Sequence, residues 1–183
     1  MFFINPFIYG GAGGDFESIA TATVGSGGAS NVEFASIGTD WQHLQLRVVA
    51  RTDAASTTSF MRLAFNGATT NLTAHYLQGN GSGTFAAFEN TGSAINFGGI
   101  TGDNASASIF GTSVLDILDY ASTSKTKVTR ALSGRDLNGS GDIVVQSGLW
   151  NSTSAITSLK VTPGSGSNFK QHSTFALYGV KAP

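Results

Sequence analysis

The three histidines of the chain, His43, His75 and His172, are the side chains best suited to acid–base catalysis near neutral pH. A serine nucleophile served by one of them would need a strained, exposed turn that holds its hydroxyl within hydrogen-bond reach of the imidazole. One such turn, the Gly-x-Ser-x-Gly motif, does not occur in the sequence. Serine is so frequent that any histidine will lie near one by chance. The pattern therefore favours surface or strand histidines, and it predicts a protein that is not an enzyme.

Asp116 and Asp119 are two carboxylates close together in the sequence. A glycosidase needs two carboxylates that face each other across a sugar, about 5–10 Å apart. A spacing of three residues along a strand places two side chains on opposite faces of a sheet. We therefore expect Asp119 to belong to a turn at the end of a strand, and we do not expect a catalytic pair.

One loop places oxygen-bearing side chains at the spacing of a calcium-binding loop. Asp136, Asn138 and Ser140 occupy positions 1, 3 and 5, a glycine follows at position 6, and Asp142 comes next. Position 12, where the motif has a bidentate glutamate, is Ser147. A short segment rich in Asn, Gly and Ser between two strands is also typical of a hairpin turn. We predict a turn and no metal, with calcium as the alternative.

Aromatic side chains are the other candidates for binding, because their apolar faces pack against the C–H patches of a sugar ring. Trp41, Tyr76 and Trp150 form the candidate glycan platform, and Tyr178 could join them. Most large aromatic residues instead fill a core or an interface. Packing in a core or an interface is therefore favoured for all four, with the glycan platform as the alternative.

The N-terminus carries the clearest signal for binding to another protein. Large apolar side chains occupy six of its first nine positions: Phe2, Phe3, Ile4, Phe7, Ile8 and Tyr9. A glycine-rich segment, residues 10–14, follows and has the composition of a hinge. Each apolar side chain gains about 1.5–3 kcal/mol on burial, so the six should pack on their own domain or on a partner. The hinge favours a partner, and we expect an anchoring arm at 1–14 and one domain at 15–183.

Charge is scarce in this chain. Only 11% of the residues are charged and the net charge is −1, whereas an ordinary soluble domain is about 25% charged. Such a surface has no basic footprint for nucleic acid, and its weak self-repulsion favours association with protein neighbours. The chain has no cysteine, which excludes disulfides, thiolate metal sites and cysteine nucleophiles. We expect no cofactor, and we expect no membrane partner because no apolar run reaches about 18 residues.

Short runs that alternate between apolar and polar residues, separated by Gly, Ser, Asn and Asp, predict an all-β chain with no helix. The spacing favours an antiparallel β-sandwich, which we expect to be of jelly-roll type. We expect a first strand pair at 17–24 and 31–37, a central strand apolar on both faces at 107–120, and a hairpin of 126–135 with 142–150. The remaining strands are expected at 42–52, 59–66, 71–78, 84–88, 94–97, 156–161 and 174–180.

The segment 42–52 alternates most regularly, which is the pattern of a strand with one buried face. The pattern places one set of side chains toward the core: Leu44, Leu46, Val48 and Ala50. It places a second set toward solvent: His43, Gln45, Arg47, Val49 and Arg51.

Several short segments of the sequence resemble a family of structural proteins of tailed phages, of the kind found in aquatic and cyanobacterial phages. These segments are residues 19–28, 41–47, 63–67, 75–81, 115–120 and 173–180, and the resemblance as a whole spans residues 17–181. They are strand patterns and include no catalytic motif, so no functional residue is carried over. Members of the family are similar in this region and differ at the N-terminus, which implies a common surface domain with interchangeable anchors.

The resemblance implies a location on the surface of a virion and assembly as a homotrimer. The leading expectation is a non-enzymatic capsid decoration or cement protein, which binds the major capsid protein through its N-terminal arm. The alternative is a tail-fibre or baseplate protein that contacts other tail proteins and binds a host surface glycan.

Overall fold

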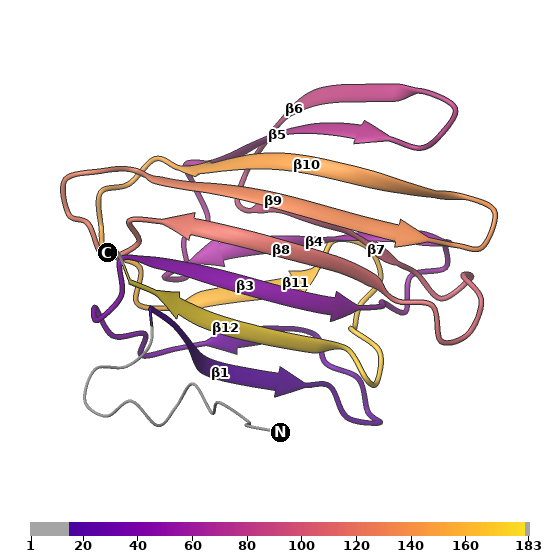
Figure 1. Ribbon diagram of the computed structural model, residues 1–183, viewed down its shortest axis with the longest axis horizontal. Coiled ribbons are helices and arrows are strands. Elements are labelled where there is room, and N and C mark those ends of the chain that lie inside the picture. Colours follow the sequence, from indigo (N-terminus) through magenta and orange to yellow (C-terminus); the bar gives the residue numbers. More distant parts are fainter. Residues whose placement is uncertain (1–14, 182–183) are drawn as a thin grey trace, which may run out of the picture.

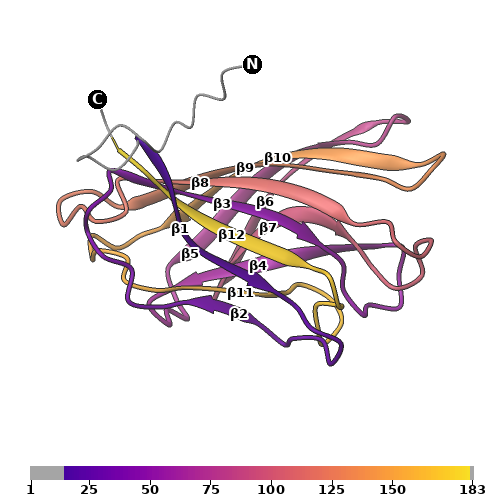
Figure 2. The same ribbon diagram turned by 60° about the horizontal axis from the view of Figure 1, so that its bottom comes forward.

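The computed structural model describes residues 15–181, which form two antiparallel β-sheets that pack face to face as a β-sandwich (Figures 1 and 2). The described residues contain no helix, so the expectation of an all-β sandwich is confirmed. None of the described segments has the helical length and apolarity that a membrane span requires. The eight-stranded sheet has the order β1-β12-β3-β8-β9-β10-β5-β6, and the four-stranded sheet has the order β2-β11-β4-β7.

The bounds of the strands lie within a few residues of the predicted ones, except at the ends of the segment 107–120. The twelve strands are β1 (Phe16–Thr23), β2 (Val32–Phe34), β3 (His43–Ala50), β4 (Thr58–Phe65), β5 (Leu72–Gly79), β6 (Thr84–Gly92), β7 (Ile95–Thr101), β8 (Gly111–Leu118), β9 (Lys127–Asp136), β10 (Gly141–Trp150), β11 (Leu159–Pro163) and β12 (Thr174–Val180).

The core lies between the two sheets and is built by the alternating residues of each strand. In β3, Leu44, Leu46, Val48 and Ala50 are all buried, as their spacing predicted. The four-stranded sheet contributes Leu63 and other fully buried residues from its facing side. Each large apolar side chain moved out of water in this way contributes about 1.5–3 kcal/mol.

Two expectations about strand pairing need correction. Segments 17–24 and 31–37 do not form a hairpin, because β1 pairs with β12 in one sheet and β2 pairs with β11 in the other. The loop between them crosses from sheet to sheet. The central strand β8 lies fourth in its sheet, as expected, but its residues alternate between buried and exposed, so only one of its faces is covered. The hairpin of β9 and β10 is confirmed.

The edge strand β7 is buried along its whole length, because it packs under β8, β9 and β10. Only one side of β7 pairs with another strand, β4. On its other side, the Thr101 carbonyl accepts from the Thr52 amide at 2.9 Å, and further groups bind side chains from the inner face of the large sheet. The Gly98 amide donates to Gln146 Oε1 at 2.7 Å, and the Gly99 amide donates to Ser133 Oγ at 2.8 Å. Gly98 has a φ of 67° at the bulge opposite β4, a conformation that favours glycine.

Arg51 was expected to face solvent, and it is instead 95% buried, since it exposes only 5% of its surface. The regular pattern of β3 ends at Ala50, so the alternation no longer fixes the direction of the next side chain. Its guanidinium donates to the backbone carbonyls of Asp103, Ala105, Ser106 and Ile109, at 2.7 to 3.1 Å. Arg51 therefore holds the loop before β8 against the end of the sandwich.

We predict that the substitution Arg51→Met lowers the free energy of unfolding by about 3 kcal/mol, because it leaves several buried carbonyls without donors. Urea denaturation followed by tryptophan fluorescence measures this change. The matched control is Arg62→Met on the exposed side of β4, which should change stability by less than about 0.5 kcal/mol. Equal effects of the two substitutions would contradict a structural role for Arg51.

Candidate functional site

The outer face of the eight-stranded sheet carries a row of exposed apolar side chains, here called the outer apolar row. It consists of Val114, Leu132, Val145 and Leu77, which lie directly opposite one another on the consecutive strands β8, β9, β10 and β5. Each of the four exposes between 40% and 57% of its surface. Ile143, two residues from Val145 on the same face, exposes 63%. Contiguous apolar surface of this kind marks a site of interaction.

The next row on the same face is polar. Arg130 Nε donates to Asp116 Oδ2 at 2.8 Å, and Gln45 Nε2 donates to Asp116 Oδ1 at 2.9 Å. Arg47 lies opposite Val114 at the end of the outer apolar row. The charges beside the apolar row are therefore of both signs, and the ion pair between Arg130 and Asp116 keeps their net effect small.

The inner face of the same sheet contributes to a second candidate site, here called the polar cleft. It opens between the two sheets beside β7 and has a volume of about 290 Å³. Its wall is built mainly of polar and aromatic side chains, including Tyr76, Gln78, Glu89, Asn96, Arg135 and Gln146. These residues come from β5, β6, β7, β9 and β10, and β4 adds Thr58, Ser59 and Phe60, so six strands meet at the site.

A buried ion pair forms one side of the polar cleft. The Arg135 and Asp142 side chains expose 8% and 5% of their surface, and Arg135 Nη2 donates to Asp142 Oδ2. The same carboxylate oxygen accepts from Gln78 Nε2 at 2.6 Å. Arg135 Nη1 also donates to the carbonyls of Ser59 and Ile100, at 2.8 and 2.9 Å, and so connects the two sheets.

Several buried polar atoms at the polar cleft have no hydrogen-bond partner. Among the described residues, these include Asn96 Oδ1, Arg135 Nε and Asp142 Oδ1. The Asn96 amide nitrogen is used, since it donates to Glu89 Oε2 at 2.8 Å. Buried polar atoms without partners are uncommon in folded proteins, and three of those found among the described residues belong to this one region of the sandwich.

The structure separates the residues of the candidate glycan platform. Trp150 is 7% exposed and packs on Phe65 in the core, with ring centroids 5.8 Å apart. Trp41 covers Gly179, where a Cβ atom would lie 2.1 Å from the indole ring, so it lies over β12. Tyr76 lines the polar cleft on β5. Because four strands separate β12 from β5, Trp41 and Tyr76 do not share one surface.

Tyr178, the fourth aromatic candidate, lies near the β1 edge of the eight-stranded sheet. Its ring stacks on Phe16 with centroids 4.8 Å apart, and the Arg47 guanidinium lies over both rings. Lys181 lies with its ammonium group 5.1 Å from the centre of the Trp41 ring. These aromatic faces are thus already occupied by neighbours in the same chain.

The loop considered for calcium is the turn of the β9–β10 hairpin. Asp136 Oδ1 accepts from the Asn138 amide at 2.8 Å, and Asn138 has a φ of 59°. Asp142 points to the inner side of the sheet, where Arg135 and Gln78 bind its carboxylate. Residues 15–181 include no cluster of three or more His, Asp or Glu side chains that could hold a metal. The two carboxylates of the candidate loop, Asp136 and Asp142, therefore have other partners.

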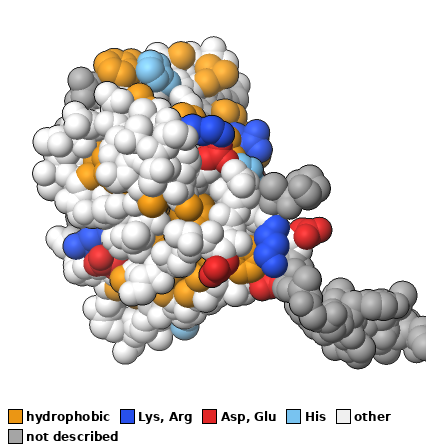
Figure 3. All heavy atoms as spheres, turned by 90° about the vertical axis from the view of Figure 1, so that its left-hand side faces the viewer, with side chains coloured by type: hydrophobic (Ala, Val, Ile, Leu, Met, Phe, Trp, Pro, Cys, Tyr) orange, Lys and Arg blue, Asp and Glu red, His pale blue; other side chains and the backbone are white. Residues whose placement is uncertain are grey.

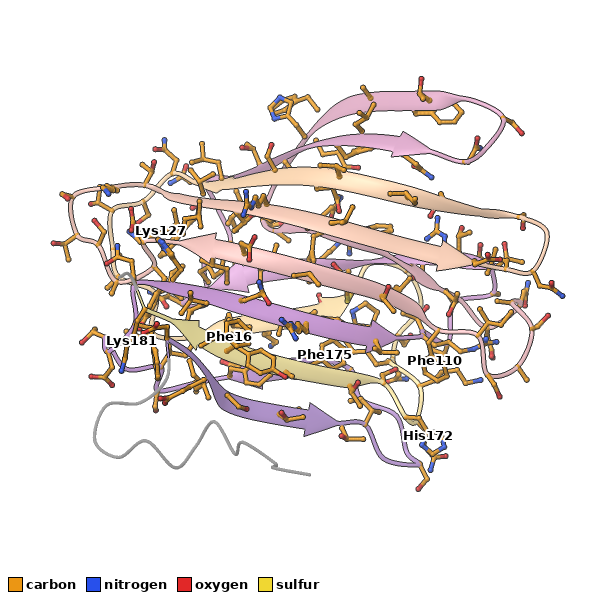
Figure 4. The ribbon with its side chains drawn as sticks, in the orientation of Figure 1. Phe16, Phe110, Lys127, His172, Phe175 and Lys181 are labelled. Atoms are coloured by element: carbon orange, nitrogen blue, oxygen red, sulfur yellow. The ribbon has the colours of Figure 1, made fainter. Side chains whose placement is uncertain are left out.

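His43 lies beside Asp119, whereas His75 and His172 lie elsewhere on the molecule. His43 Nδ1 accepts from the Asp119 amide at 3.0 Å, and the His75 ring packs on Phe88 with centroids 4.7 Å apart. His172 is exposed in the loop before β12, as Figure 4 shows. Asp119 follows β8 with a φ of 47°, as expected for a residue of a turn at the strand end. Hydrogen bonds from Lys125 and Gln42 lower the pKa of the Asp119 carboxyl.

Lys127 is a buried residue that sequence reasoning did not single out. It is fully buried at the start of β9, and its ammonium group donates to the carbonyls of Ser122, Lys125 and Thr153 at 2.6, 2.7 and 3.3 Å. Burial lowers the pKa of Lys127. Figure 4 places this residue at the end of the sandwich away from His172. Lys127 thus joins the β8–β9 loop to the β10–β11 loop.

The residues of the polar cleft were also missed, with the exception of Tyr76. A local signal exists, because Gln146 occupies an inward position between the inward Val144 and Gly148 of β10. A polar residue in an apolar series indicates a buried hydrogen bond. It does not identify the partner, since Gln146 binds the amide of Gly98, which is 48 residues away.

The anchoring arm, with Phe2, Phe3, Ile4, Phe7, Ile8 and Tyr9, lies outside the described residues. The described chain begins at Asp15, whose carbonyl accepts from the Lys181 amide at 2.8 Å. It enters β1 at the edge of the eight-stranded sheet. Two strands, β12 and β3, separate that edge strand from the outer apolar row.

Comparison of the chain with protein-family models, with curated proteins and with solved structures finds no match.

We predict that calcium does not stabilise this protein, because the carboxylates of its candidate loop already have partners. Thermal unfolding should give the same Tm in excess EDTA and in millimolar CaCl₂. A bound ion present at about 100 times its Kd would stabilise the fold by about 2.7 kcal/mol, which is readily seen as a shift in Tm. A rise in Tm with calcium that the substitution Asp136→Asn abolishes would contradict the prediction.

Proposed function

We propose that this protein is a non-enzymatic structural protein of a virus particle, which assembles on the particle surface as a capsid decoration or cement protein. The observation that carries its role in assembly is the outer apolar row. Four apolar side chains in register across four strands form a continuous strip, and a protein that works alone gains nothing from leaving such a strip in water. The assignment to a virion is supported by the sequence resemblance to tailed-phage structural proteins.

The scarcity of charge supports the same proposal. Three of the ten basic residues, Arg51, Lys127 and Arg135, are buried, so the surface carries still less charge than the composition suggests. Figure 3 shows one end of the molecule, where a few charged side chains, several of them next to one of opposite sign, interrupt a mostly uncharged surface. Little electrostatic repulsion opposes close packing of identical copies. We therefore assign the outer apolar row to contacts between copies of this chain, in the proposed homotrimer.

The attachment to the particle is assigned to the arm at residues 1–14. The described chain begins at the β1 edge of the eight-stranded sheet, and the outer apolar row lies on β8, β9, β10 and β5. An arm that starts at this edge is able to contact a capsid protein while the row contacts another copy. The two parts of the molecule thus have separate roles in the proposal.

A tail-fibre or baseplate receptor-binding protein is the second candidate function. The polar cleft favours it, because an adhesin needs a site with convergent polar groups and a cement protein does not. The two functions are separated by fractionating disrupted particles. A cement protein is found on capsids that lack tails, and a receptor-binding protein is found with the tails.

The substitution Leu132→Ser at the centre of the outer apolar row should convert the oligomer to monomers without loss of fold. Leu132 exposes 57% of its surface, so its removal costs the isolated domain little, whereas an interface would lose an apolar contact at its centre. Light scattering coupled to size-exclusion chromatography at micromolar concentration measures the mass.

The matched control is Phe85→Ser. Phe85 exposes 54% of its surface but lies opposite Gln78 on the other face of the sheet, and its loss should leave the oligomer intact. A wild-type protein that is monomeric at these concentrations would contradict the proposed contact.

Deletion of residues 1–9 should leave the domain folded and abolish its binding to particles. The core described above is formed within residues 15–181, so the Tm should change by only a few degrees. Binding is measured by adding purified protein to capsids that lack the decoration and recovering the capsids by sedimentation. A large fall in Tm would show that the arm belongs to the core, and undiminished binding would place the anchor elsewhere.

A further inference from the structure

We propose that the polar cleft is a binding site for a neutral, polyhydroxylated ring of the size of a monosaccharide. Of the aromatic residues that the sequence suggested for sugar binding, Tyr76 alone lines this cleft. The cleft has a volume of about 290 Å³, at the lower end of the range of small-molecule sites, which is about 300–1,000 Å³. A single ring, alone or at the end of a longer glycan, therefore fits better than an extended chain.

The cleft exists because the two sheets differ in width. At one edge of the eight-stranded sheet, β5 and β6 continue past β7, which is the last strand of the four-stranded sheet (Figure 2). Beyond the buried Leu72 and Ala74, the inner face of these two strands thus has no opposing strand to pack on. Polar side chains from this overhang, Gln78 and Glu89, face Asn96 of β7 across the space.

The polar side chains of the lining define what the ligand must offer. Glu89 and the amide oxygen of Gln78 accept hydrogen bonds, and the Tyr76 hydroxyl both donates and accepts. Behind them lie Asn96 and Arg135, whose side chains are more than nine-tenths buried and whose Oδ1 and Nε atoms have no partner in the protein. A hydroxyl group both donates and accepts, so a ligand with several hydroxyls on one ring is able to satisfy such a set. An apolar ligand would leave these atoms without partners.

The apolar part of the wall suits the other surface of a sugar. Tyr76 of β5 and Val144 of β10 form the apolar part of the lining. Aromatic side chains bury large apolar areas, and a tyrosine adds a hydroxyl at its edge. A sugar ring has C–H groups to pack on these side chains and hydroxyls to reach the amides beyond them.

The charges at the cleft disfavour acidic ligands. Arg135 is bound to Asp142, so its positive charge is already compensated. Glu89 is the remaining charged residue in the lining, and its partner there is the neutral amide of Asn96. The local field therefore repels carboxylates, sulfates and phosphates, and the site should discriminate against uronic acids.

The cleft would bind its ligand in the same way whether the protein lies on the capsid or on the tail. It does not depend on the outer apolar row, because Tyr76 and Leu77 are adjacent in β5 and point to opposite faces of the sheet. Variants on the two faces therefore separate the two proposals.

The test is saturation-transfer NMR of the full chain with methyl glucoside, methyl galactoside, methyl mannoside and methyl N-acetylglucosaminide, with methyl glucuronide as the acidic probe. We expect transfer to at least one neutral glycoside with a Kd of about 1 mM, and weaker binding of the glucuronide. The substitution Tyr76→Ala should weaken binding by about tenfold or more. The substitution Glu89→Gln retains the shape of the side chain and should reduce the discrimination against the glucuronide.

Leu132→Ser on the outer face is the control, and it should bind the glycosides as the wild type does even if it becomes monomeric. If the wild-type protein gives no transfer to any of the four neutral probes, the proposal is wrong. It is also wrong if Tyr76→Ala and Glu89→Gln both bind as the wild type does. Because Glu89→Gln is nearly isosteric, it remains informative even if Tyr76→Ala fails to fold.

Discussion

The unpaired edge of β7 is the constraint on which the arrangement of this molecule depends. A strand at the edge of a sheet carries backbone groups without partners, and here that edge is buried under a wider sheet. Water cannot satisfy those groups, so side chains of the large sheet must. Gln146 and Ser133 accept from the amides of Gly98 and Gly99, and Arg135 binds the carbonyl of Ile100.

This requirement places polar residues where a sandwich would otherwise have apolar ones. Arg135 needs a counter-charge once it is buried, which Asp142 supplies, and Gln78 binds the same carboxylate. The polar layer then continues beyond β7 onto β5 and β6, where no strand covers it. The polar cleft is thus an extension of the hydrogen-bond network that the edge of β7 demands.

The loops at the two ends are fastened in a similar way. Arg51 and Lys127 are buried cations whose partners are mainly backbone carbonyls of neighbouring loops. A cation with several donors is able to hold an irregular segment that has no ladder of its own. This use of basic residues removes charge from the surface, and it leaves the outer face of the large sheet with an apolar row beside one compensated ion pair.

The sequence by itself determined the strands, the sandwich class, the buried side of β3 and the β9–β10 hairpin. Each of these follows from a local pattern, since alternation has a period of two residues and a hairpin joins neighbours in the chain. The partners of β1 and β2, the burial of Arg51, the outer apolar row and the polar cleft were decided by the tertiary structure. The alternation of apolar and polar residues along a strand does not depend on which strands are its neighbours. It therefore cannot place Val145 opposite Leu77 or bring Gln146 to Gly98. Those contacts join residues far apart in the chain, and they exist only once the two unequal sheets have packed.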